Sequence, residues 1–332
     1  MPDRRGFFKE VLREMMSAVE GVGAVLESLD EPDPDSWRPP LPPPAAAAAG
    51  FVDDEGLEEL VRAAQLEHRL TDIRGFVRAG ARLTPAGESQ TGSRLGGSPD
   101  LPAGFAWPSW NGHELAFLGQ FDLAELTAAG GRSLLPEAGL LLAFADLTVR
   151  PSGLSPEHAG SCSVVLVPSS CELTEDERRT PALHEVRVRL TRELQLPSAW
   201  SFLAEPLALS PEETDAWEEL RTTLAEAQGV ELEDADFGRI ALHRLLGYQD
   251  EIGRELELDC QLASSGLDAD DAVVYFDARG DHEAEARRWR LLLQVTADAT
   301  LRLGDGVERL FICIRENDLQ TRRLDRAWPL LR

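Results

Sequence analysis

Residues 115–122 read Leu-Ala-Phe-Leu-Gly-Gln-Phe-Asp, and residues 289–296 read Trp-Arg-Leu-Leu-Leu-Gln-Val-Thr. Each stretch is mostly apolar and carries one glutamine at a matched point, Gln120 in the first and Gln294 in the second. A turn and a second apolar run follow each stretch, at 140–144 and 310–314. We interpret these as two copies of a strand–turn–strand unit that form pseudo-twofold halves, with chance similarity of two apolar strands as the alternative. A glutamine buried in such a strand must hydrogen-bond through both its carbonyl and its amide group.

The surrounding chain places strands and helices in blocks. Further strands are predicted at 162–168, 184–190, 272–276 and 299–303, and helices at 53–70, 210–229 and 237–246. The helix at 210 has the clearest start, because Ser210 is a good N-cap, Pro211 suits the first turn and Glu213 completes a capping box. Blocks without strict alternation favour an α+β fold with mainly antiparallel sheet.

The first 50 residues differ from the rest. Apolar residues there recur at alternating steps of four and three, which is the seam of an amphipathic helix. The seam consists of Phe8, Leu12, Met15, Val19, Val22, Leu26 and Leu29. A stretch rich in proline and alanine follows at 30–50 and is typical of a semi-rigid spacer. We therefore predict an interaction helix at 1–29, a linker at 30–50 and a main domain at 51–332; the helix folds back on the body, self-associates or binds a partner.

The charge balance excludes several classes of function. The chain has 33 basic and 59 acidic residues, a net charge of −26. Such an excess disfavours binding to nucleic acid and to anionic membranes, and it favours basic partners. Its four cysteines form no Cys-x-x-Cys pair, and no His or Cys pair has zinc-site spacing. We expect a cytoplasmic protein with neither metal nor cofactor.

Several motifs, in order, resemble the YwqG-like family (DUF1963) over roughly residues 80–330. They are Gly96-Gly97-Ser98-Pro99-Asp100-Leu101-Pro102, Trp107-Pro108, 117–123, 135–141, His243-Arg244-Leu245-Leu246-Gly247-Tyr248, 289–294 and Gly304-Asp305-Gly306. The resemblance implies a small cytoplasmic bacterial protein of unknown activity. It also implies relatives that are sometimes found in toxin–immunity gene neighbourhoods.

Two groups of residues are candidates for a site. Gln120, His243, Gln294 and Asp305 form a candidate polar site between the two halves, with His243 expected on an apolar helix. Trp107, Pro108 and Trp110 form a candidate binding surface, although these indoles also suit the anchoring of a loop on the sheet.

Two functions follow from these observations. The first is a non-catalytic, acidic protein-binding module with a basic or amphipathic partner, of which toxin immunity is one form. The second is a small-molecule-binding or hydrolytic enzyme that uses the polar site. A closed pocket around the four polar residues favours the enzyme, and an acidic face without a pocket favours the binding module.

Overall fold

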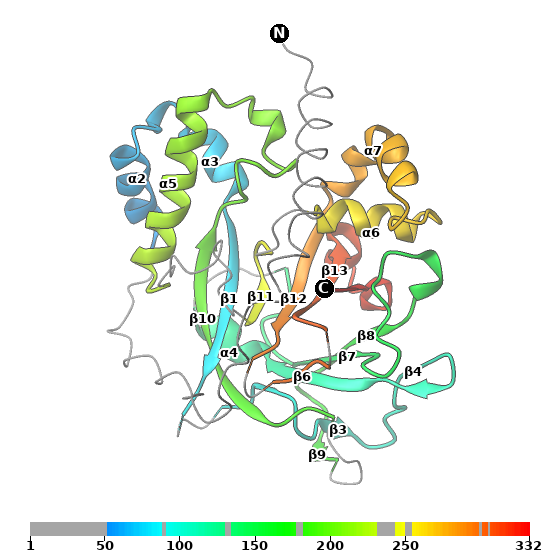
Figure 1. Ribbon diagram of the computed structural model, residues 1–332. Coiled ribbons are helices and arrows are strands. Elements are labelled where there is room, and N and C mark those ends of the chain that lie inside the picture. Colours follow the sequence, from blue (N-terminus) through cyan, green and yellow to red (C-terminus); the bar gives the residue numbers. More distant parts are fainter. Residues whose placement is uncertain are drawn as a thin grey trace, which may run out of the picture. The chain divides into compact units, whose positions relative to one another are not determined.

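The computed structural model describes most of the chain beyond residue 51, and all of the described residues belong to the compact unit Ala47–Arg332 (Figure 1). They are 52–87, 91–129, 134–176, 182–230, 243–249, 254–298, 301–304 and 306–332. The predicted interaction helix and its seam, Phe8 to Leu29, and the linker at 30–50 lie outside them. In this part of the chain, no helix is long and apolar enough to cross a membrane.

One antiparallel sheet of ten strands organises the fold. Its order is β14-β13-β12-β11-β1-β10-β2-β6-β7-β8. The strands are β1 (Arg78–Pro85), β2 (Arg94–Leu95), β6 (Ala116–Asp122), β7 (Leu140–Ala145), β8 (Cys162–Val167), β10 (Val186–Gln195), β11 (His243–Leu246), β12 (Trp289–Thr296), β13 (Arg309–Arg315) and β14 (Trp328–Leu331). The predicted α+β fold with mainly antiparallel sheet is confirmed.

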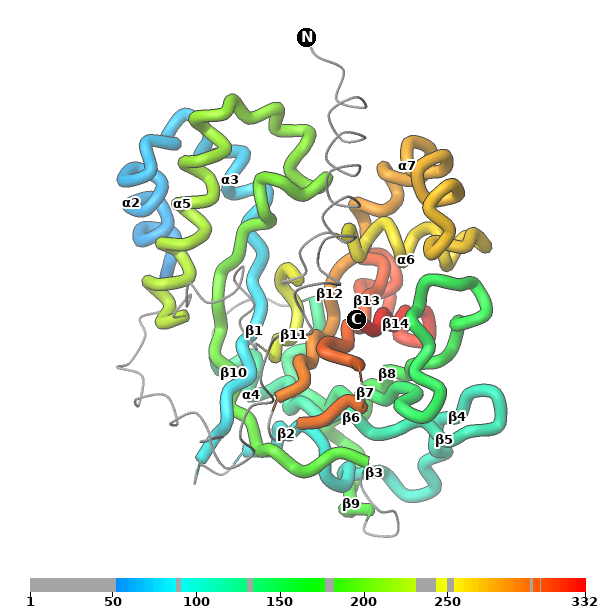
Figure 2. Tube along the Cα trace, in the orientation of Figure 1, coloured from blue at the N-terminus to red at the C-terminus, as the bar shows by residue number. Residues whose placement is uncertain are grey.

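The strand order shows two equivalent halves. The first half supplies β1, β2, β6, β7 and β8, and the second supplies β10, β11, β12, β13 and β14. In each half the last four strands are adjacent and in the same order, whereas the first strand pairs with the other half: β1 with β11 and β10 with β2. Figure 2 shows β1 and β11 side by side. The halves therefore exchange their first strands and meet where β1 pairs with β10.

The duplication extends to single residues. Gln120 on β6 lies opposite Arg94 on β2, and Gln294 on β12 lies opposite Arg244 on β11. A bulge precedes the glutamine in both halves, in the β6–β7 pair and in the β12–β13 pair. Both glutamine side chains are fully buried. The predicted pseudo-twofold duplication is therefore confirmed.

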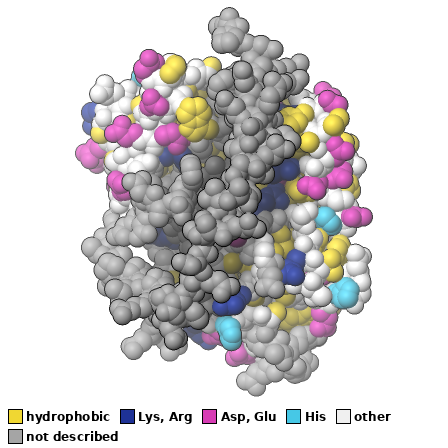
Figure 3. All heavy atoms as spheres, in the orientation of Figure 1, with side chains coloured by type: hydrophobic (Ala, Val, Ile, Leu, Met, Phe, Trp, Pro, Cys, Tyr) yellow, Lys and Arg dark blue, Asp and Glu magenta, His cyan; other side chains and the backbone are white. Residues whose placement is uncertain are grey.

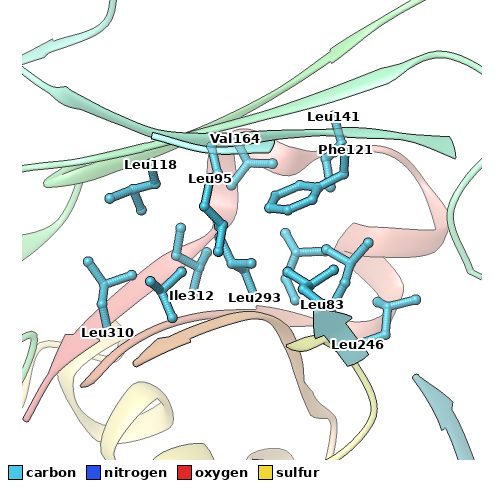
Figure 4. Packing of buried hydrophobic residues seen from close by; sticks show 14 of the residues in the cluster. Leu83, Leu95, Leu118, Phe121, Leu141, Val164, Leu246, Leu293, Leu310 and Ile312 are labelled. Carbon is cyan, nitrogen blue, oxygen red and sulfur yellow. The ribbon is translucent and has the colours of Figure 1, made fainter. Parts of the chain in front are cut away.

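The sheet curls so that its two halves enclose a common apolar core (Figure 4). Leu118, Phe121 and Leu141 approach this core from the first half, and Leu293 and Ile312 approach it from the second. Full burial of one such side chain stabilises the folded state by about 1.5–3 kcal/mol. Because the two halves share this core, polar and functional groups are restricted to the outer faces and to the loops.

Helices and small sheets cover the outer faces. The α-helices are α2 (Asp54–Ala63), α3 (Leu70–Phe76), α4 (Leu123–Ala128), α5 (Pro211–Ala227), α6 (Leu256–Ser264), α7 (Ala272–Ala286) and α8 (Glu316–Gln320). The 3₁₀ turns are η2 (Glu67–Arg69), η3 (Pro156–His158), η4 (Glu205–Leu207) and η5 (Leu324–Arg326). The small sheets pair β3 (Asp100–Pro102) with β9 (Leu173–Glu175) and β4 (Ser109–Trp110) with β5 (His113–Glu114).

The predicted start of α5 is confirmed in atomic detail. The Glu213 N–H donates to Ser210 Oγ, and the Ser210 N–H donates to Glu213 Oε2 at 2.8 Å. Arg69 Nε also donates to Glu213 Oε1 at 2.7 Å, and this bond is the main reason that the pKa of Glu213 is lowered. The predicted stop at Gly229 also holds, since Gly229 follows the C-cap and has φ +69°.

Three predicted elements are wrong. Residues 243–246, predicted as helix with His243 on it, form strand β11; they are buried throughout and so show no polar alternation. Residues 272–276, predicted as a strand, form the start of α7, because the Asp271 carboxylate accepts from the N–H groups of Val273 and Val274 and caps a helix there. Of the predicted strand at 299–303, the structure describes residues 301–303, and these do not form a strand. They follow a turn in which the Leu301 N–H donates to Asp298 Oδ1.

Candidate functional site

Gln120 holds a loop on the sheet. Its Oε1 accepts from the Asp100 N–H at 2.9 Å. Its Nε2 donates to the Gly92 carbonyl at 2.9 Å and to Asp100 Oδ2 at 2.6 Å. Both ends of the amide are therefore satisfied within the chain, as the burial of Gln120 requires. These bonds make Gln120 an anchor for the loop that carries Asp100.

Arg94 completes this cluster. It is 3% exposed, and its Nε donates to the Ser98 carbonyl at 2.9 Å. Its Nη2 lies 3.0 Å from Asp100 Oδ1. Asp100 is thus bound by Gln120 on one carboxylate oxygen and by Arg94 on the other, which offsets the cost of burying the arginine charge.

The second half repeats the arrangement around Arg244. Its Nε donates to Glu193 Oε1 at 2.5 Å, and its Nη1 donates to the Tyr248 carbonyl at 3.3 Å. The carbonyl lies four residues after the arginine, as Ser98 lies four residues after Arg94. Sequence reasoning missed both arginines. The signal was present, because 94–100 and 244–250 share Arg-Leu-x-Gly-x-x-Asp. Asp250 lies outside the described residues.

His243 begins β11, the strand next to β12, but Arg244 and not His243 lies opposite Gln294. His243 Nδ1 accepts from the Thr296 N–H at 3.2 Å, and its Nε2 is 3.4 Å from Asp298 Oδ2. Gln120 belongs to the other half, and four strands separate β6 from β12 in the sheet. Asp305 lies outside the described residues. The structure therefore places His243 and Gln294 on neighbouring strands but on opposite faces of the sheet, and it keeps Gln120 apart. The four-residue site stays a prediction.

The predicted aromatic surface anchors a loop. The Trp107 ring meets Phe144 on β7 edge to face, with ring centroids 5.2 Å apart, and its indole N–H donates to the Leu115 carbonyl at 2.8 Å. The Trp110 indole N–H donates to the Ala159 carbonyl at 2.9 Å. Both indoles and Pro108 between them are half-buried. Part of each ring is still available to a partner, so a binding role for this surface stays a prediction.

A buried glutamate, Glu257, and a half-buried arginine, Arg78, were not predicted. Glu257 on α6 is 3% exposed, and burial raises its pKa to about 7. In the described part of the chain, Glu257 Oε2 and Arg78 Nη1 have no hydrogen-bond partner. The Arg78 guanidinium lies 4.0 Å above the Tyr248 ring, and burial lowers its pKa. Perturbed, buried groups of this kind are candidates for proton chemistry or for pH-dependent stability.

The outer face of α7 combines exposed apolar and acidic side chains. We call this set the α7 face: Val273, Phe276, Asp277, Gly280, Asp281 and Ala284. These residues recur at steps of three, one, three, one and three, so they share one side of the helix, and all are exposed. Val273 is 69% exposed and Phe276 is 55% exposed. The opposite side of α7 contacts the core through Tyr275, Ala278 and Ala286.

The charged residues of the α7 face are acidic. Arg279 pairs with Glu283 at 2.6 Å, whereas Asp277 and Asp281 form no ion pair within the described residues. Asp271 and two further aspartates precede the helix. Figure 3 shows acidic and hydrophobic side chains together over the region of α7. The face therefore offers apolar contact surrounded by negative charge.

Comparison with known proteins gives a family and no activity. A family model described as a domain of unknown function (DUF1963) matches residues 93–331. None of the curated proteins matches the chain.

Proposed function

Since this chain belongs to the DUF1963 family, whose description assigns no function, we propose its function from the α7 face: the protein is a non-catalytic binding module for a basic, amphipathic protein. The main observation is the exposure of Val273 and Phe276 on a helix side whose aspartates, Asp277 and Asp281, form no ion pair with any described residue. A basic protein toxin is one partner of this kind. We place the binding in the cytoplasm, where the four free cysteines would persist as thiols.

Both parts of the α7 face support this proposal. Exposed apolar side chains within a polar rim are typical of interaction sites. Uncompensated aspartates and a net charge of −26 would steer a basic partner toward the helix and accelerate its association. Burying the exposed parts of Val273 and Phe276 would contribute about 2 kcal/mol, which corresponds to about 30-fold in affinity.

The test uses the full chain as bait in cytoplasm from its source organism. The variant Val273→Ser/Phe276→Ser removes the apolar pair, and Val149→Ser is the matched control, because Val149 is 56% exposed in the loop after β7. We expect basic proteins that bind to the wild type and to the control but lose about 30-fold in affinity for the double variant. Equal recovery by the double variant and the control would contradict the proposal.

The charge contribution is tested with the purified partner. Asp277→Asn/Asp281→Asn should slow association and flatten its dependence on salt, while dissociation changes little. An association rate that is insensitive to salt in the wild type, or a partner that is acidic, would also contradict the proposal.

A further inference from the structure

Helix α7 packs on α6 and carries a glycine at the centre of its exposed side (Figure 1). Val273, Gly280 and Ala284 are separated by seven and four residues, so they lie on one line along the α7 face. Phe276 flanks this line on one side and Asp281 on the other. Because Gly280 has no side chain and Ala284 has only a methyl group, little covers the helix backbone along this line.

The fold does not require a glycine at position 280. Gly280 lies in the middle of the 15-residue helix α7, and its φ is not positive. In the described part of the chain, no heavy atom beyond its own stretch of helix lies within 4 Å of the position that a Cβ would take. Glycine is a poor residue in the middle of a helix. The space above Gly280 is therefore open to a partner that approaches the helix backbone closely.

A second helix is the occupant that fits this surface. An extended segment would bury backbone N–H and C=O groups against the α7 face, which offers them no backbone partners because a helix uses its own. A helix satisfies these groups internally. Packed helices lie about 8–10 Å apart between their axes, and the short end of this range requires small residues at the crossing point. Gly280 and Ala284 provide such a crossing point.

The charges of the α7 face indicate the chemistry of this helix. Asp277 and Asp281 are one turn apart and form no ion pair within the described residues. On the other flank, Arg279 is already paired with Glu283 and Glu205. The two aspartates therefore keep their charges for cations of a partner. Two cations four residues apart on the partner's helix match the spacing of the aspartates.

We propose that the α7 face binds an α-helix of the partner, which crosses α7 over Gly280 and Ala284. The apolar side of this helix contacts Val273 and Phe276, and two Arg or Lys residues one turn apart at its edge bind the two aspartates. This inference rests on the proposed function, which requires a basic, amphipathic partner but does not require a helix. It makes Gly280 a residue that determines specificity, because a longer side chain there would hold the two helices apart.

The probe is a capped peptide of about 18 residues made of alanine, glutamine, leucine and arginine. Its leucines form one helical face, and its two arginines lie four residues apart at the edge of that face. Three control peptides change one property each: a central proline breaks the helix, a permuted order abolishes the faces, and glutamate replaces arginine. Binding to the full chain is measured by fluorescence anisotropy. We expect the helical peptide to bind at least about tenfold more tightly than each control.

Variants test the role of Gly280 directly. Gly280→Leu should weaken binding of the helical peptide at least about tenfold, because the new side chain fills the crossing point. Gly75→Leu is the matched control, since Gly75 is also exposed, lies in helix α3 and has open space around its Cβ position. This control should bind the peptide like the wild type. Both variants should melt at the wild-type temperature or above it, because leucine favours a helix more than glycine does.

The outcomes separate this inference from the proposed function. Unchanged or tighter binding by Gly280→Leu, or no binding of the helical peptide up to about 1 mM, would overturn the inference. If the proline peptide binds as tightly as the helical peptide and Val273→Ser/Phe276→Ser releases both, the inference fails and the proposed function stands. If the helical peptide binds equally to the wild type and to Val273→Ser/Phe276→Ser, both fail.

Discussion

Replacing Glu257 by glutamine should remove part of the pH dependence of folding. Burial raises the pKa of this carboxyl from 4.5 to about 7 in the folded chain. The native state therefore binds the proton more tightly than the unfolded state does. The stabilisation is fully present below pH 4.5 and is lost as the pH rises through 7. From these two pKa values, Glu257 alone should lower the free energy of unfolding by about 2–3 kcal/mol between pH 5 and pH 8.5.

The assay is urea unfolding of the wild type and Glu257→Gln at pH 5 and pH 8.5. The glutamine has the same shape and does not titrate, so any constant cost of the substitution cancels when the two pH values are compared. Glu285→Gln is the control, because it removes one carboxylate from a side chain that is 51% exposed. Wild type and control should lose about 2–3 kcal/mol more than Glu257→Gln on going to pH 8.5. An equal loss in all three proteins would refute the assignment of a raised pKa to Glu257.

Three further outcomes are expected. Glu213→Gln should lower the melting temperature at neutral pH. The difference from the wild type should shrink as the pH falls, because the lowered pKa of Glu213 gives stability that acid removes. A difference in melting temperature that stays constant with pH would contradict this. Gly153→Ala should lower the free energy of unfolding in urea by about 3 kcal/mol, because Gly153 has φ +83° and a methyl group would collide with a carbonyl oxygen of β14. Gly104 is the control: it has φ +74° but lies in open space, so Gly104→Ala should cost about 1 kcal/mol. A thiol reagent should label one cysteine of the native chain rapidly, and Cys171→Ser should abolish that reaction, because Cys171 is exposed and the other three are buried.

The duplicated sheet could be predicted because its signal is local. The stretches around Gln120 and Gln294 are both apolar strands with one polar residue that needs a fixed partner. Their similarity can therefore be seen in the sequence alone. The capping box at Ser210 is equally local, since all its atoms lie within four residues. Such elements need no knowledge of the tertiary contacts.

The elements that were missed depend on distant contacts. Strand β1 carries Arg78 and Arg82 among small residues, and it becomes a central strand only because β10 and β11 pair with its two edges. Helix α6 is buried over nearly its whole length although it contains Glu257, Asp259 and Gln261. Some of their partners come from segments far away in the sequence: Arg332 donates to the Asp259 carboxylate at 2.7 Å, and the Trp289 indole N–H donates to Gln261 Oε1 at 3.0 Å. Hydropathy alone places such residues at the surface.

Only part of the candidate site could be predicted, because it too depends on contacts between distant segments. Gln120 was identified, but its partners Arg94 and Asp100 became visible only through the sheet register. The bonds of this glutamine anchor a loop, and its expected part in a binding site stays a prediction. A repeated polar residue in a duplicated fold is a poor guide to a site, because the duplication preserves whatever holds each half together.

The same reasoning indicates where function should be sought: where the halves differ. Between β2 and β6, the described residues form short strands and no helix, whereas the equivalent connection between β11 and β12 contains α6 and α7. From the pairing of β6 with β7 and of β12 with β13, Arg315 occupies the place that Asp146 holds in the first half. There the Asp146 carboxylate caps its own loop by accepting from the N–H groups of Thr148 and Val149, whereas Arg315 lines a cavity. The α7 face thus lies on an element that the second half has and the first half lacks. A function carried by the shared architecture would instead be equally sensitive to substitutions in either half, such as Arg94→Gln and Arg244→Gln.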